Sequence, residues 1–156
     1  EIVGYLPSGK MIQKGYDYKC DGLNAEHKFL VYRITYTKPD GNVIEFTWQQ
    51  IKNYCKKYNL QHVKQFFYGT LSELVTTLNV EDPRDWQEEF VSVLQRRFNL
   101  EQNCKECKNV VPAEGICVRI DDEDTYTVFK LKSKRFLEQE TKDIDAGVVS
   151  IEEENS

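Results

Sequence analysis

Residues 28–46 read KFLVYRITYTKPDGNVIEF. The first ten residues of this stretch are mostly β-branched or aromatic, which predicts a strand over 28–37. The run Pro-Asp-Gly-Asn at 39–42 is a strong turn signal, and residues 43–46 have the composition of a second strand. The stretch therefore predicts an antiparallel hairpin.

Helical signals follow this hairpin. Thr47 is expected to cap a helix over about 48–58, in which Trp48, Ile51 and Cys55 recur at helical spacing. Asp82-Pro83 provides a cap and a first helical position for the clearest helix of the chain. Its apolar stripe is formed by Trp86, Phe90, Val93, Leu94 and Phe98.

The remaining segments alternate between predicted strands and predicted short helices. Strands are expected near the N-terminus and over 62–69, 114–120 and 125–132. Short helices are expected from Thr70 or Ser72 to about Leu78 and near 134–142, with a loop over 99–113. Hairpin connections outnumber regular βαβ units in this order, which predicts an α+β fold with a largely antiparallel sheet.

Composition excludes several classes of protein. The chain has 156 residues, of which 40% are hydrophobic and 30% charged, with 8 Gly and 4 Pro. These values suit one globular domain and exclude collagen-like and wholly disordered chains. No apolar run approaches the roughly 20 residues of a membrane-spanning helix, so we expect no membrane partner.

Charge is distributed unevenly. The net charge is −5, but residues 137–156 hold seven acids and one lysine, so the rest of the chain carries +1. The negative overall charge therefore does not exclude a nucleic-acid substrate. It does not indicate one either, because proteins that coat DNA or RNA are usually strongly basic.

Five cysteines without a secretory signal favour a reducing, cytoplasmic compartment over a disulfide framework. Because the sequence starts at Glu1 without an initiator Met, we expect it to be a piece of a longer protein.

Two lysines stand two residues apart in the last predicted strand. Side chains alternate along a strand, so Lys130 and Lys132 are expected on one face, about 7 Å apart. An anion such as a phosphate would relieve their repulsion. The alternative is a solvated edge strand, where lysines are common.

Glu114 precedes the other apolar strand and is followed by Gly115. Glycine permits close approach of a ligand, and a carboxylate there suits a divalent metal. The alternative is a solvated loop glutamate in front of a core strand.

Taken together, these segments resemble a known superfamily. EGICVR at 114–119 and FKLKS at 129–133 resemble motifs IV and V of the covalent nucleotidyltransferases, which include RNA ligases, DNA ligases and mRNA capping guanylyltransferases. The continuation KSKRFLE at 132–138 is most similar to the ATP-dependent RNA ligases. EIVG at 1–4 resembles motif III, and FLVYRI at 29–34 resembles motif IIIa. The motifs stand in the family's order.

The resemblance implies roles for individual residues. Glu1 would contact the ribose, Tyr32 would stack on adenine, and Lys130 and Lys132 would contact the α-phosphate, with Lys132 also orienting pyrophosphate. Glu114 would hold the catalytic Mg²⁺. At position 33 the family pattern often has Asp, whereas this chain has Arg33.

The family's nucleophile is the lysine of a K-x-D-G motif. KCDG at 19–22 has this form, but in the family the motif precedes motif III by several tens of residues. We therefore expect Lys19 to belong to a turn, and the true nucleophile to lie in a segment upstream of Glu1.

The implied reaction has three steps. The lysine attacks the α-phosphate of ATP to form lysyl-AMP and release pyrophosphate, AMP moves to an RNA 5′-phosphate with release of the lysine, and an RNA 3′-OH displaces AMP and joins the strands. Residues 1–142 would form the C-terminal part of the nucleotidyltransferase domain, with its ATP-grasp-like antiparallel core, and residues 143–156 an acidic tail. A fragment without the nucleophile would be inactive alone.

NCKECKN at 103–109 has the spacing of a zinc knuckle. Cys20 and His27 would complete a Cys3His site with Cys104 and Cys107. The alternative is a pair of reduced loop cysteines. Cys55 and Cys117 are expected to be packing residues.

The sequence also fits other functions. A capping guanylyltransferase or a DNA ligase would share the same motifs. A non-catalytic, zinc-stabilised nucleic-acid-binding module would carry them in degenerate form.

Overall fold

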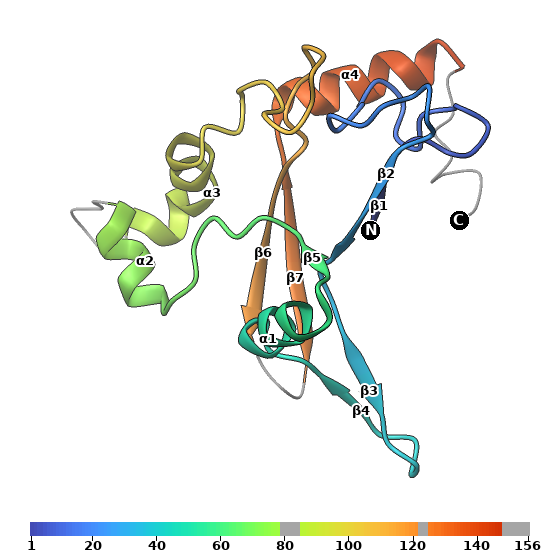
Figure 1. Cartoon of the computed structure of the whole chain (residues 1–156). Helices are drawn as coiled ribbons and strands as arrows, with labels where there is room; N and C mark the ends of the chain where they lie inside the picture. Colours follow the sequence, from blue (N-terminus) through green and yellow to red (C-terminus); the bar gives the residue numbers. More distant parts are fainter. Residues whose placement is uncertain (79–84, 122–124, 148–156) are drawn as a thin grey trace.

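The computed structural model describes residues 1–78, 85–121 and 125–147 (Figure 1). Its elements are β1 (Ile2–Gly4), β2 (His27–Val31), β3 (Thr35–Thr37), β4 (Val43–Glu45), α1 (Trp48–Tyr58), β5 (Gln61–His62), α2 (Leu71–Leu78), α3 (Asp85–Arg97), β6 (Gly115–Asp121), β7 (Tyr126–Lys132) and α4 (Lys134–Asp145). The mixture of helices and small antiparallel sheets confirms the α+β prediction. None of these helices combines the length and apolar character needed to cross a bilayer.

The strand predicted over 28–37 is divided into β2 and β3, which pair with different partners. β2 lies between β1, which is antiparallel to it, and β5, which is parallel to it. β3 forms an antiparallel hairpin with β4, in which Tyr36 pairs with Ile44. Residues 32–34 connect the two strands, so the prediction of one continuous strand was wrong at this point.

β5 is much shorter than the strand predicted over 62–69. The Val63 N–H still donates to the Val31 carbonyl of β2 at 3.0 Å, but beyond Val63 the backbone leaves the sheet and Gln65 lies over α1 instead. Its side-chain oxygen accepts hydrogen bonds from Trp48 Nε1 at 2.7 Å and from Lys52 Nζ at 3.1 Å. Side-chain contacts with the helix therefore replace strand pairing in this segment.

α1 begins and ends where the sequence predicted. Thr47 and Gln50 form a capping box, in which each side chain accepts a hydrogen bond from the other residue's backbone N–H. Asn59 ends the helix in the left-handed conformation. The apolar face of α1 packs on β2 and forms the core cluster of Val31, Trp48, Ile51 and Cys55.

α2 is capped by Thr70 rather than Ser72. The Thr70 hydroxyl accepts the Glu73 N–H at 3.3 Å, while the Glu73 carboxylate accepts the Thr70 N–H at 2.7 Å. The start predicted for the next helix at Asp82-Pro83 and the side chain of Trp86 lie outside the described residues. Within α3, Val93 and Leu94 are buried as expected.

β6 and β7 form the longest ladder, with seven pairs from Gly115–Lys132 to Asp121–Tyr126. Gly115 has a φ of 149°, and a Cβ at this position would lie 2.0 Å from the Leu131 carbonyl oxygen. Only glycine therefore fits where β6 starts.

α4 follows β7 directly. The Ser133 hydroxyl accepts the Phe136 N–H at 3.1 Å and donates to the Ala113 carbonyl at 2.6 Å, so this fully buried serine caps the helix and fixes the start of the hairpin. α4 extends to Asp145, past the predicted end at 142 and into the acidic segment 143–156. Residues 148–156 of that segment lie outside the described residues.

Candidate nucleotide-binding site

The β6–β7 ladder fixes the positions of the two lysines. Lys130 pairs with Cys117, and Lys132 pairs with Gly115. Because side chains alternate between the faces of a strand, Lys130, Lys132 and Cys117 all belong to one face of the hairpin.

The two lysines have different surroundings. Lys130 is exposed and forms no ion pair with any described residue. Lys132 is half-buried, and its ammonium donates to both Glu140 oxygens of α4 at 2.8 and 3.1 Å. It also lies 5.2 Å from the centroid of the Phe136 ring. α4 therefore holds Lys132, whereas the charge of Lys130 is available to an anion.

Glu114 stands at the entrance to this hairpin and is partly buried. Its backbone carbonyl accepts the Ser133 N–H at 2.8 Å, which extends the pairing of the two strands by one step. Burial raises the pKa of the Tyr18 hydroxyl well above its ordinary value, and the negative charges of Glu114 and Glu1 raise it further.

Several charged groups shift the pKa of the Cys117 thiol. Cys117 is exposed overall, but partial desolvation of its thiol raises the pKa; the Lys130 ammonium lowers it, and the charges of Glu114 and Glu1 raise it again. Charges from the start of the chain, from the residue just before β6 and from β7 therefore act on one thiol. These segments are the ones that resemble motifs III, IV and V.

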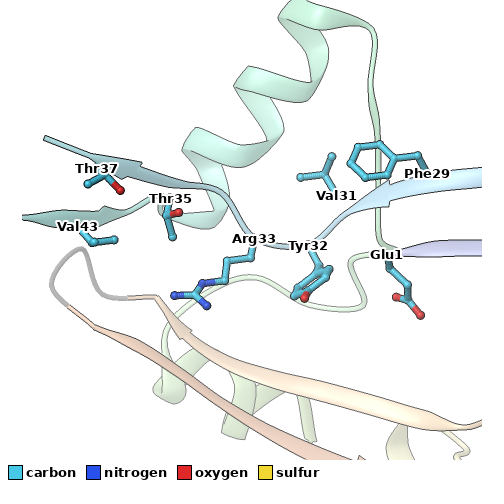
Figure 2. A pocket seen from close by; sticks show the side chains of 8 residues that line it. All are labelled: Glu1, Phe29, Val31, Tyr32, Arg33, Thr35, Thr37 and Val43. Atoms are coloured by element: carbon cyan, nitrogen blue, oxygen red, sulfur yellow. The ribbon is translucent and has the colours of Figure 1, made fainter. Parts of the chain in front are cut away.

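Tyr32 and Glu1 contribute to a pocket of about 420 Å³, whose lining does not include Lys130, Lys132 or Glu114 (Figure 2). Figure 2 shows Glu1, Tyr32 and Arg33 projecting toward the β6–β7 hairpin, while Phe29 and Val31 project from the opposite side of β2. The Tyr32 side chain is 48% exposed, so an aromatic ring is available beside the pocket. The pocket is lined by Glu1, Phe29, Val31, Tyr32, Arg33, Thr35, Thr37 and Val43.

Arg33 has a structural partner on each side. It forms an ion pair with the buried Glu45, and this hydrogen bonding holds the pKa of Glu45 below its ordinary value. Its guanidinium also lies 4.1 Å from the centroid of the Tyr126 ring in β7. The residue that departs from the family pattern thus joins the β3–β4 hairpin to the β6–β7 hairpin.

Arg119 makes the second connection between these hairpins. Its guanidinium donates to the carbonyls of Tyr32, at 3.5 Å, and Phe46, and it lies 3.3 Å from Asp121. It also lies 5.4 Å from the Tyr126 ring, on which Arg33 packs as well. The site is therefore held together by two arginines whose structural roles the sequence pattern did not indicate.

The four cysteine and histidine residues proposed as zinc ligands do not form one cluster in the structure. Cys104 and Cys107 lie together, and burial with the Cys104 hydrogen bond raises the pKa of Cys107 to about 12. Cys20 is buried against Gly4, and His27 is exposed with its Nδ1 3.2 Å from the Ala25 carbonyl. Within residues 1–78, 85–121 and 125–147, no three His, Cys, Asp or Glu side chains are grouped to hold a metal, so the zinc site stays a prediction.

Of the two cysteines expected to pack in the core, Cys55 is buried and Cys117 is exposed. The prediction for Cys117 was wrong because its side chain lies on the lysine-bearing face of the hairpin. The pairing of Cys117 with Lys130 became visible only in the structure, because the sequence of β6 does not show which of its faces is covered.

Lys19 occupies a loop, as expected of turn chemistry. It has a φ of 56°, and its backbone N–H donates to Asp17 at 2.9 Å. Asp21 accepts the Leu23 N–H at 2.9 Å and thereby stabilises the turn that follows.

Comparisons of the chain with protein-family models, with curated proteins and with solved structures find no match. Its function is therefore inferred from the residues described above.

Proposed function

We propose that this chain forms the nucleotide-binding site of an ATP-dependent RNA ligase. The observation that carries the proposal is that Lys130 and Lys132 share one face of the β6–β7 hairpin, where Lys130 has no ion-pair partner among the described residues. Glu1, Glu114 and Lys130 follow one another along the chain in the order of motifs III, IV and V, and Tyr32 of the segment resembling motif IIIa lies on the same side of β2 as Glu1 (Figure 2).

The charges suit a nucleoside triphosphate. Lys130, which has no carboxylate partner among the described residues, contacts the α-phosphate, and Lys132 joins it after exchanging Glu140 for the phosphate. Phosphoryl transfer depends mainly on placing positive charge where negative charge develops. Tyr32 stacks on the adenine, and Glu1 binds the ribose.

Glu114 is assigned to Mg²⁺. Carboxylate oxygens are the ligands that this ion prefers, and Glu114 stands directly before Gly115, which pairs with Lys132 in the ladder. Bound Mg²⁺ would neutralise charge on the phosphates. The proposed cycle joins an RNA 5′-phosphate to a 3′-OH through lysyl-AMP and RNA-adenylate, and Lys19 is not assigned as the nucleophile.

Calorimetric titration of ATP with Mg²⁺ into the chain tests the proposal. Lys130→Ala is expected to weaken binding about 10- to 100-fold, because charged hydrogen bonds contribute about 1.5–3 kcal/mol. Glu114→Gln is expected to remove the Mg²⁺ dependence. Lys14→Ala, an exposed lysine in the loop after β1, is the matched control.

Two results would contradict the proposal. The first is an absence of ATP binding by the unaltered chain. The second is an equal loss of affinity in the Lys130 and Lys14 variants. Tighter binding of GTP than of ATP would favour a capping guanylyltransferase instead.

A further inference from the structure

Residues 46–72 contain no Asp or Glu, although the whole chain has a net charge of −5. The same residues include four lysines and seven aromatic residues. They form α1, β5, the loop that follows and the first turn of α2. A positive, aromatic segment in an acidic protein indicates an anionic partner with flat, stackable groups.

The outer face of α1 presents two lysines and two tyrosines to solvent, namely Lys56, Lys57, Tyr54 and Tyr58. Its inner face is buried in the core, and Tyr54 and Tyr58 remain 39% and 51% exposed. Their ring centroids lie 4.5 Å apart, and the Lys57 ammonium lies 5.0 Å from the Tyr58 ring. The exposed residues of this face are Gln49, Gln50, Asn53, Tyr54, Lys56, Lys57 and Tyr58.

The loop after β5 also carries lysine and exposed aromatic side chains. Lys52 of α1 lies 5.2 Å from the ring of Tyr68, which is 50% exposed. Lys64 lies 5.6 Å from the half-exposed Phe66 ring and also forms an exposed ion pair with Glu106 at 3.5 Å. We call the outer face of α1 together with Lys52 and Tyr68 the α1 surface.

We propose that the α1 surface binds single-stranded RNA. Lysines neutralise backbone phosphates, and exposed rings stack on unpaired bases regardless of their sequence. Gln50 Oε1 accepts the Thr47 N–H and Gln49 Nε2 donates to Asn53 Oδ1 at 3.1 Å, so the other amide groups of these three amide residues are the ones that can bind base edges. The choice of RNA rather than DNA rests on the proposed function, because an RNA ligase must hold the strand whose end it adenylylates.

A membrane surface fits these residues less well. Helices that lie on bilayers bury a broad apolar face in the lipid. The face that α1 exposes is made of lysines, tyrosines and amides, while its apolar side chains already pack in the core.

The test is fluorescence anisotropy with a 12-nucleotide, 5′-fluorescein-labelled single-stranded RNA of mixed sequence. Charge reversal in Lys56→Glu/Lys57→Glu is expected to weaken binding at least tenfold and to reduce the salt dependence of the affinity. Lys10→Glu/Lys14→Glu changes the net charge equally at exposed lysines outside the segment, and it is expected to weaken binding much less.

A second pair of variants separates stacking from charge. Tyr54→Ala/Tyr58→Ala is expected to weaken binding roughly tenfold, since stacking contributes about 1–3 kcal/mol per base. Tyr54→Phe/Tyr58→Phe retains the rings and is expected to bind almost as the unaltered chain does. Circular dichroism checks that all four variants fold.

Equal losses in the two charge-reversal variants would overturn the proposal. So would a chain that binds phosphatidylserine vesicles but not the RNA. The same variants are also titrated with ATP and are expected to keep the affinity of the unaltered chain. A variant of the α1 surface that loses RNA binding but keeps ATP binding therefore supports the RNA-binding proposal alone. An unaltered chain that binds RNA but not ATP would contradict only the proposed nucleotide site.

Discussion

The ammonium of Lys132 lies 2.8 Å from a carboxylate oxygen of Glu140, so one of the two lysines assigned to phosphate is already paired with α4. Both side chains are about one-third exposed, which makes this ion pair a weak one that a phosphate can displace. Glu140 and the nucleotide would therefore compete for the same charge.

Replacing Glu140 tests this competition. Glu140→Gln is expected to strengthen ATP binding by up to about fivefold, because an exposed ion pair contributes about 0.2–1 kcal/mol. Glu138→Gln removes the same charge from an exposed position on the same helix and is the control. Calorimetry measures both, and weaker binding by Glu140→Gln would show that Glu140 positions Lys132 instead.

Ser133 is expected to be important for stability. Ser133→Ala removes the cap of α4 and leaves the Ala113 carbonyl without its hydrogen bond. The free energy of unfolding should fall by about 1–3 kcal/mol. Denaturant unfolding measures the change, with Ser92→Ala at an exposed position of α3 as control. Equal stabilities of the two variants would contradict the role of this cap.

Asp17 makes the stability depend on pH. Its burial opposes ionisation, but backbone N–H groups of Lys19, Lys108 and Asn109 donate to the carboxylate and hold its pKa below the ordinary value. The resulting stability is present above the unfolded-state pKa of about 4 and is lost as the pH falls through the lowered folded-state value.

Asp17→Asn should therefore lower stability at neutral pH and flatten its decline in acid. Denaturant unfolding between pH 2 and 7 compares the two proteins. Asp40→Asn, in the exposed turn between β3 and β4, is the control. Parallel declines for the unaltered chain and Asp17→Asn would show that Asp17 does not stabilise the loop that carries Cys107.

Local signals predicted much of the fold. Thr47 and the β3–β4 turn act through residues within a few positions of each other, so their effects can be read from the sequence. The break between β2 and β3 involves Arg119, which donates to the Tyr32 carbonyl from 87 residues away. Likewise, Gln65 leaves the predicted strand because Trp48 and Lys52 bind it.

The candidate site, like the fold, was only partly predictable from local sequence signals. Strand alternation was enough to place Lys130 and Lys132 on one face of β7. The pairing of Lys132 with Glu140 and the packing of Arg33 on Tyr126 arise from tertiary contacts that no local pattern encodes. Cys117 was mistaken for a core residue because an apolar strand does not reveal which of its faces is covered.

The most direct test of the nucleotide site uses Cys117, since the charges of Lys130, Glu114 and Glu1 all shift the pKa of its thiol. N-ethylmaleimide modifies thiolates, and mass spectrometry can follow Cys117 and Cys104 separately. Without nucleotide, Glu114→Gln should speed modification of Cys117 by lowering its pKa, and Lys130→Ala should slow it. ATP with Mg²⁺ should slow modification of Cys117 saturably while leaving Cys104 unchanged. A rate at Cys117 that no ATP concentration alters would contradict a nucleotide bound at this face of the hairpin.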